Sequence, residues 1–127
     1  MKKEIQKKII IVGASADRQK FGNKAVRAYR QSGWKVYPVN PHETEIEGLK
    51  CFAKATDVPV KTDLASIYLP PSIGLTIVDD LKAKGIKHAY LNPGSESPEL
   101  VEALQKAGIE PWLACSILAI GLDPKNF

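Results

Sequence analysis

The chain has 127 residues, a length that suits one domain with one hydrophobic core. Its apolar content of 44%, charged content of 25% and net charge of +4 are ordinary for a globular protein, and no apolar run approaches the ~20 residues that cross a membrane. Two cysteines and two histidines give neither a disulfide framework nor metal-site spacing, and the lysines are dispersed without aromatic interleaving. We therefore expect no metal, no nucleic acid and no membrane partner.

The first apolar run, Ile9–Val12, follows a basic segment and leads into Gly13 instead of a small-residue cleavage site. We therefore expect no signal peptide and a cytoplasmic protein. The run is entirely β-branched, which is typical of a central parallel strand buried on both faces. A helix over Lys24–Gln31 should follow and end at Gly33.

The second strand is expected over Trp34–Val39, although Pro38 lacks a backbone donor and should make the strand irregular or end it nearby. His42–Lys54 is interpreted as an excursion with a turn at Gly48. One helical turn is expected within Ala55–Lys61.

The third strand is expected over Leu64–Leu69, and Ser72 is the expected N-cap of the helix that ends at Gly85. The fourth strand should cover Lys87–Leu91, before a helix that Ser97 caps and Gly108 ends.

The last strand is expected over Glu110–Cys115, and the tail Ser116–Phe127 is apolar up to Leu122. Such a tail should pack on the domain or on a neighbouring subunit, so a homodimer through it is possible.

Three of the expected helices end in the same way, with a glycine, an apolar residue and then a strand. Glycine takes the left-handed position after a helix, and the apolar residue packs back on the last turn. The repeat predicts an α/β fold, an open parallel sheet with helices on both faces in three layers, within a single domain over residues 1–127. The three segments are Ser32-Gly33-Trp34, Lys84-Gly85-Ile86 and Ala107-Gly108-Ile109.

Ligands of open parallel sheets bind beyond the C-terminal ends of the strands, where the strand order reverses. Short polar or proline-rich segments leave those ends here, and together they predict a binding site. They are Gly13-Ala14-Ser15, Val39-Asn40-Pro41, Leu69-Pro70-Pro71, Asn92-Pro93-Gly94 and Cys115-Ser116.

The Gly13 turn carries only the first glycine of the dinucleotide fingerprint G-x-G-x-x-G, since Ser15 and Arg18 stand in the other two places. The second strand ends at Asn40, where an NAD site has a carboxylate for the ribose hydroxyls. Both departures argue against NAD.

Three cations, Arg18, Lys20 and Lys24, gather at the expected N-terminus of the first helix. This end of a helix favours anions, so the cations suit a ligand with more phosphate than a simple dinucleotide.

These segments together resemble the CoA-binding domain family over about residues 5 to 116. The family includes small stand-alone cytoplasmic proteins and is similar to the N-terminal domain of the succinyl-CoA synthetase α subunit and of ADP-forming acyl-CoA synthetases. The resemblance rests on Ile9–Val12 with Gly13-Ala14-Ser15, Gly22-Asn23, Gly33–Pro41, Ile46-Glu47-Gly48, Asp63 and Leu69-Pro70-Pro71.

The resemblance implies a Rossmann-like fold and CoA, or an acyl-CoA, as the ligand. It also implies a part of the ligand for each segment: the phosphates for Gly13-Ala14-Ser15 with Arg18 and Lys20, the adenosine for Val39-Asn40-Pro41, the adenine for Leu69-Pro70-Pro71, and the pantetheine for Asn92-Pro93-Gly94.

No catalytic constellation is visible in the sequence. His42 follows the second strand, His88 lies inside a strand, and Cys115 is either a core residue or a nucleophile without an adjoining histidine. The related synthetases place their phosphorylated histidine in another domain, and this chain ends before one could begin. We expect a binding protein rather than an enzyme. The alternatives are an NAD(P)-binding enzyme or redox sensor, and a non-catalytic interaction subunit of an acyl-CoA synthetase-like complex.

Overall fold

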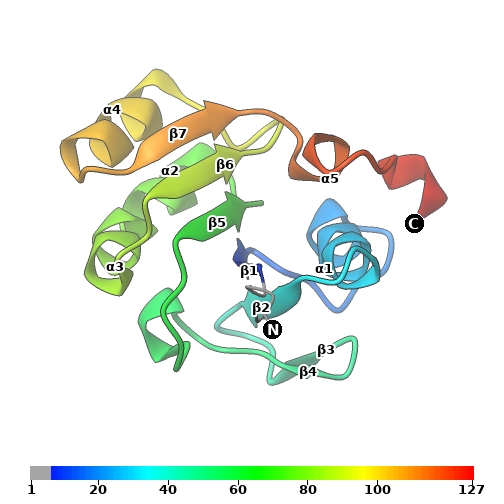
Figure 1. Ribbon diagram of the computed structural model, residues 1–127. Helices are drawn as coiled ribbons and strands as arrows, with labels where there is room; N and C mark the ends of the chain where they lie inside the picture. Colours follow the sequence, from blue (N-terminus) through cyan, green and yellow to red (C-terminus); the bar gives the residue numbers. More distant parts are fainter. Residues whose placement is uncertain (1–6) are drawn as a thin grey trace, which may run out of the picture.

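The computed structural model describes residues 7–127, in which five parallel strands form one sheet (Figure 1). The order across the sheet is β2-β1-β5-β6-β7, so the chain moves from β1 to one edge and then returns past β1 to build the other half. This arrangement confirms the expected α/β fold with a parallel sheet. The strands are β1 (Lys8–Val12), β2 (Lys35–Val39), β5 (Leu64–Ile67), β6 (His88–Leu91) and β7 (Glu110–Leu113).

Helices cover both faces of the sheet, which gives the three expected layers (Figure 1). One face carries α1 (Phe21–Gln31) and the short α5 (Ser116–Ala119). The other face carries α2 (Pro71–Gly74), α3 (Val78–Lys84) and α4 (Pro98–Lys106). Short 3₁₀ turns complete the chain at Ala55–Asp57 (η1), Leu75–Ile77 (η2) and Pro124–Asn126 (η3). Within residues 7–127, every helix is too short or too polar to cross a lipid bilayer.

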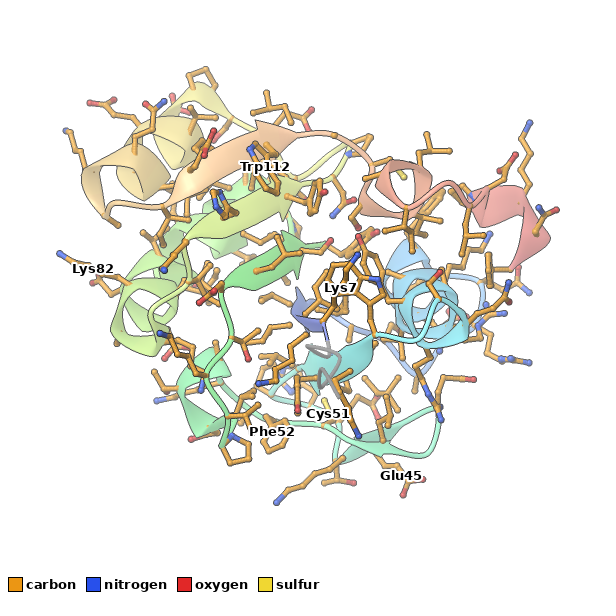
Figure 2. The ribbon with its side chains drawn as sticks, in the orientation of Figure 1. Lys7, Glu45, Cys51, Phe52, Lys82 and Trp112 are labelled. Carbon is orange, nitrogen blue, oxygen red and sulfur yellow. The ribbon has the colours of Figure 1, made fainter. Side chains whose placement is uncertain are left out.

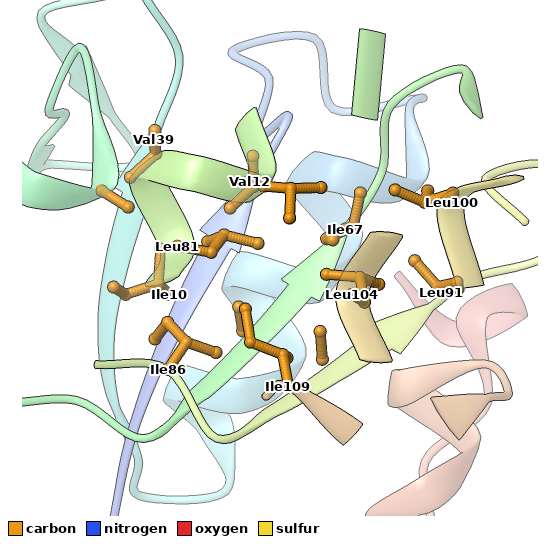
Figure 3. Close-up of a cluster of buried hydrophobic side chains, with 14 of the residues drawn as sticks. Ile10, Val12, Val39, Ile67, Leu81, Ile86, Leu91, Leu100, Leu104 and Ile109 are labelled. Atoms are coloured by element: carbon orange, nitrogen blue, oxygen red, sulfur yellow. The ribbon is translucent and has the colours of Figure 1, made fainter. Parts of the chain in front are cut away.

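The unbroken apolar run of β1 is explained by the two cores that it separates. Ile10 and Val12 face the core under α3 and α4, which Figure 3 shows. Ile9 and Ile11 face the core under α1. Successive strand residues point to opposite faces of the sheet. A strand with helices packed on both faces therefore has no position for a polar side chain.

The three glycine-ended helices confirm the repeated motif that predicted the fold. Gly33, Gly85 and Gly108 all have positive φ, between 79° and 88°. The residue after each glycine donates its N–H to the carbonyl five residues back, which satisfies a free carbonyl of the last turn. The three bonds are Trp34 N to Tyr29 O (3.0 Å), Ile86 N to Leu81 O (3.1 Å) and Ile109 N to Leu104 O (2.9 Å).

The tail contains a fourth helix followed by a glycine with positive φ, which was not expected. The helix α5 ends at Ala119, Gly121 has a φ of 80°, and Leu122 N donates to Ile117 O at 3.3 Å. Ile117 is fully buried against α1, so the tail packs on its own domain. Leu118 is 60% exposed and remains available to a second copy, and the homodimer stays a prediction.

Two helix starts differ from those expected. The helix α1 begins at Phe21 rather than Lys24. Ser72 is not an N-cap, because the helix begins at Pro71 with Pro70 in the capping position and no side-chain cap. Proline at the first helical position loses no hydrogen bond there, and this preference decides where α2 starts.

The excursion after β2 forms a hairpin of β3 (Glu45–Ile46) and β4 (Leu49–Lys50), with the expected turn at Gly48. Next along the chain, Phe52 pairs with the outer edge of β2 (Figure 2), donating its N–H to Pro38 O at 2.9 Å. The strand β2 therefore continues through Pro38 to its end at Val39. Proline is tolerated there because the bonds with Phe52 use the carbonyl of Pro38 and the N–H of Asn40, so no donor is needed at Pro38 itself.

Ser97 confirms its predicted role, since its Oγ accepts from Leu100 N at 3.1 Å. We expect Ser97→Ala to lower the free energy of unfolding by about 1 kcal/mol, because the Leu100 amide loses its partner. Ser72→Ala is the matched control and should change it by less than about 0.5 kcal/mol, since Ser72 is exposed and caps nothing. Urea denaturation measures both, and equal losses would contradict the assignment of the caps.

Candidate functional site

The strand order reverses between β1 and β5, which places a crevice at the C-terminal ends of these two neighbouring strands. Two cavities open at this edge of the sheet. They lie on either side of the turn after β1, and only Gly13 and Leu69 line both.

The first cavity has a volume of about 330 Å³ and lies between the end of β2 and the helices α2 and α3. Its walls are mostly apolar with a few polar groups, which is typical of a ligand pocket. Apart from the shared pair, its lining residues are Val12, Val39, Asn40, Pro41, His42, Ala53, Lys54, Ala55, Ile73, Thr76, Ile77, Asp80 and Leu81.

The second cavity has a volume of about 360 Å³ and lies between the start of α1 and the ends of β5 and β6. Apart from the shared pair, its lining residues are Lys20, Phe21, Gly22, Tyr68, Pro70, Asn92, Pro93, Gly94, Ser95 and Cys115.

Two glycines allow the backbone to approach itself at the boundary of the cavities. A Cβ on Gly13, whose φ is +84°, would lie 2.5 Å from Tyr68 O. A Cβ on Gly22 would lie 2.4 Å from Gly13 O. Gly22 thus gives the close packing of helix against turn that the third fingerprint glycine provides in dinucleotide sites. The fingerprint spacing did not find it, because Gly22 lies four residues beyond the expected place.

Asn40 joins the ends of β1 and β2. Its Nδ2 donates to Ala14 O at 2.8 Å, and its Oδ1 accepts from His42 N at 2.8 Å. Gly13 N donates to Val39 O at 3.0 Å beside them. An aspartate in this place would put a carboxylate oxygen against the Ala14 carbonyl, and the two oxygens would repel each other. The geometry therefore explains why asparagine, and not aspartate, follows the strand.

A second network fixes the loop between Gly13 and α1. Asn23, which is fully buried, donates its Nδ2 to Ser15 O at 2.9 Å and to Glu47 Oε2 at 3.1 Å. Arg18 forms an ion pair with the same carboxylate, with 3.4 Å between Nη2 and Oε1. Glu47 has a φ of +51°, which is costly for a non-glycine residue, and these contacts hold it there.

The predicted site residues fall into two groups. Ten of them line the cavities: Gly13, Lys20, Val39, Asn40, Pro41, Leu69, Pro70, Asn92, Pro93 and Gly94. The other four lie beside them, with Ala14 fully buried, Ser15 accepting from Asp17 N, Arg18 paired with Glu47, and Pro71 at the start of α2. The buried Ala14 therefore presents no surface to a ligand and serves packing.

A buried polar network supports the floor of the second cavity. Asn92 Nδ2 donates to Ser66 Oγ at 2.8 Å, and its Oδ1 accepts from Ser116 N at 2.9 Å. Ser116 Oγ lies 2.7 Å from Ser66 Oγ and 3.0 Å from the Tyr68 hydroxyl. Burial raises the pKa of Tyr68 to about 12, and it also raises the pKa of Tyr29, whose hydroxyl donates to Ser116 O.

The two histidines and Cys115 lie in different parts of the structure and do not form the compact cluster of side chains that a catalytic site requires. His42 lines the first cavity, whereas Cys115 is half-buried and lines the second, so it is not a fully buried core residue. The His88 ring stacks on Trp112 with centroids 4.5 Å apart, which indicates a structural role for this histidine. Among residues 7–127, no group of three His, Cys, Asp or Glu side chains could hold a metal ion.

Sequence reasoning missed Lys54, Thr76 and Asp80 in the first cavity. Lys54 directly precedes η1, Thr76 lies in η2 and Asp80 lies in α3, so none of them belongs to a segment that directly follows a strand of the main sheet. A wall built by a packed helix leaves no local motif, so only the fold could identify them.

We expect Gly22→Ala to lower the free energy of unfolding by about 2 kcal/mol, because the new methyl group meets the Gly13 carbonyl. Helix propensity alone predicts the opposite sign, a gain of about 1 kcal/mol. Gly74→Ala is the comparison and should cost less, since its methyl group would meet the end of the Leu100 side chain at 2.9 Å and not a backbone carbonyl. Thermal and urea denaturation would contradict the packing argument if Gly22→Ala proved stabilising.

We also expect stability to fall with rising pH once the pH exceeds about 10. The folded Tyr68 keeps its proton up to a pKa of about 12, whereas the ordinary value is 10.0, so in this window the folded state binds more protons. Stability then decreases as pH rises. Urea denaturation between pH 8 and pH 11 should show a shallower decline for Tyr68→Phe than for the unchanged protein. Identical slopes would contradict this assignment.

Comparison with known proteins places this geometry in a family. The sequence matches the model of the CoA binding domain over residues 7–120. ADP-forming acetate–CoA ligase II of Archaeoglobus fulgidus is 35% identical over 95 residues, which cover 73% of this chain and 14% of the ligase. The α subunit of ADP-forming acetate–CoA ligase II of Pyrococcus furiosus is 30% identical over 112 residues, which cover 80% of this chain and 24% of the subunit.

Solved structures agree with the sequence match. A conserved hypothetical protein of Pyrococcus furiosus superposes with a TM-score of 0.81 at 34% identity, over 89% of this chain and 98% of that one. The dinucleotide-forming acetyl-CoA synthetase 1 of Ca. Korarchaeum cryptofilum superposes with a TM-score of 0.75 at 36% identity, over 84% of this chain and 25% of that one. The chain thus spans 12% to 24% of the length of the first curated relatives. With its Rossmann-like fold and a family match over residues 7–120, the chain belongs to the CoA-binding domain family.

Proposed function

We propose that this protein binds CoA or an acyl-CoA at the C-terminal edge of its sheet, and that it does so without catalysis of its own. The observation that carries the proposal is the pair of cavities that meet at the Gly13 turn, at the switch point of the strand order. CoA has a nucleoside at one end and a pantetheine chain at the other, joined by a diphosphate. Two pockets on either side of one turn suit such a ligand.

In this arrangement the adenosine occupies the first cavity, between Val39-Asn40-Pro41 and Leu69. The pantetheine follows the second cavity along Asn92-Pro93-Gly94 towards Cys115, and the diphosphate crosses Gly13. The second cavity also contains Lys20 and the first residues of α1, Phe21 and Gly22. The amides of a first helical turn have no partner within the helix, so they can donate to a phosphate.

The geometry also supports CoA over NAD(P). An NAD site has an acid at the end of the second strand that accepts from the ribose hydroxyls. Here Asn40 has both ends of its amide engaged, with Ala14 O and with His42 N. The alternative of an NAD(P)-binding enzyme or redox sensor therefore has less support.

The absence of catalysis is inferred from the separation of reactive groups. His42 and Cys115 line different cavities, so no Cys–His pair forms among the described lining residues. The relatives that are ligases are four to eight times longer than the matched region. The match to acetate–CoA ligases supports a second possibility, in which the protein is a non-catalytic interaction subunit that supplies CoA to a synthetase-like partner.

A thermal-shift series tests the proposal. Ligand at ~100 times its Kd should add ~2.7 kcal/mol of stability. We expect a clear shift with CoA, a smaller one with dephospho-CoA, which lacks one phosphate, and none with NAD. A larger shift with NAD than with CoA would overturn the proposal, and no shift with any of the three would favour the interaction subunit.

Two lysine variants extend the same assay. Lys20→Ala should reduce the CoA shift, and the loss should be greatest at low salt, because the lysine acts through its charge on the phosphates. Lys82→Ala is the matched control, since Lys82 lies on α3 outside both cavities and should leave the shift unchanged (Figure 2).

A further inference from the structure

One carboxylate stands out in a cleft that is proposed to hold a polyanion. Among the described residues that line the two cavities, Asp80 is the only acidic one. It belongs to α3 and faces the first cavity from the side opposite the β2 exit. A carboxylate repels phosphates, so its position should coincide with a part of the ligand that is neutral and rich in donors.

Two hydrogen bonds hold the Asp80 carboxylate in place, and it can still accept others. Its Oδ2 accepts from Ala55 N at 2.9 Å, and its Oδ1 accepts from Thr56 Oγ1 at 2.8 Å. An ionised carboxylate offers about four acceptor sites, so capacity remains for another donor. Lys54 lines the same cavity, yet within residues 7–127 it forms no ion pair with Asp80.

The surroundings of Asp80 suit a flat aromatic base. Apolar side chains from both walls, Val39 and Pro41 on one side with Ile73 and Ile77 on the other, line the cavity beside it. A base in this cavity would bury its faces against these groups and present its edge to the few polar side chains. Adenine carries an exocyclic amine on that edge, and an amine needs an acceptor when water is excluded.

Resting on the proposed function, we infer that Asp80 accepts a hydrogen bond from the exocyclic amine of adenine. Asp80 thereby makes the site selective for adenine over purines with a carbonyl at that position. A carbonyl oxygen there would face the carboxylate without a proton between them. This contact also orients the ligand, because it holds the base at the end of the cleft farthest from the Lys20 side.

A purely structural role for Asp80 is the competing explanation, since the carboxylate already ties η1 to α3. The substitution Asp80→Asn separates the two roles. Its carbonyl oxygen can still accept from Ala55 N, and its NH₂ group can donate to Thr56 Oγ1. The variant should therefore keep its fold, while the group that faces the base changes from a carboxylate to an amide.

The experiment compares CoA with its deaminated analogue, in which hypoxanthine replaces adenine, by isothermal titration calorimetry. The unchanged protein should bind CoA at least about tenfold more tightly, as expected for a hydrogen bond to a charged group. In Asp80→Asn the preference should fall several-fold, because the amide can donate to the hypoxanthine oxygen. Asp79→Asn, a change at the exposed neighbouring residue on α3, is the matched control and should keep the preference.

Each outcome bears on the inference. Equal affinity of the unchanged protein for the two ligands would overturn it, even if Asp80→Asn failed to fold. An unchanged preference in a folded Asp80→Asn would also overturn it, and both results would leave CoA binding itself intact. If the unchanged protein bound neither ligand, the proposed function would fail as well, which distinguishes the two failures.

Discussion

The structure depends on a close approach of backbone to backbone at the end of β1. Gly13 lies against the Tyr68 carbonyl at the exit of β5, and Gly22 at the start of α1 lies against the Gly13 carbonyl. No side chain fits between these segments, so strand, turn and helix can be brought together only by glycine. Because this contact lies at the switch point of the strand order, the same constraint that packs the domain also creates the boundary between the two cavities.

Hydrogen bonds of two asparagines then set the shape of the cleft around this contact. Asn40 links the exit of β2 to the turn, and Asn92 links the exit of β6 to β5 and to α5. In each case one amide donates to a carbonyl and accepts from a backbone N–H. Aspartate could not do both, because it has no donor when ionised. The two asparagines at the strand ends thus hold the backbone of the cleft in place, and this order does not require a bound ligand.

Much of this edge could be predicted from the sequence, because the evidence was local. A β-branched run indicated a strand that is buried twice, and glycine followed by an apolar residue indicated where helices end. Other features depend on tertiary packing. Gly22 and Asn23 are poor helix formers, yet α1 includes them because Gly22 packs on the turn and Asn23 bonds Ser15 and Glu47. The start of α2 differs for a local reason, because Pro71 takes the first helical position and leaves Pro70, rather than Ser72, in the capping place.

The charges of the cleft could be predicted only in part. Lys20 was expected from its place before the first helix, whereas Asp80 lies on α3, where no motif indicated it. Lys20 and the start of α1 make the second cavity favourable to anions, whereas Asp80 places negative charge in the wall of the first. In the proposed binding mode, the diphosphate of CoA lies near Lys20 and the neutral adenine base lies near Asp80. Arg18, which was also expected at the phosphates, instead forms an ion pair with Glu47, and Asn23 of α1 donates a hydrogen bond to the same carboxylate. The proposed orientation of the ligand therefore rests on which charges the fold leaves without an ion pair among the described residues, and a count of the charges along the sequence does not reveal it.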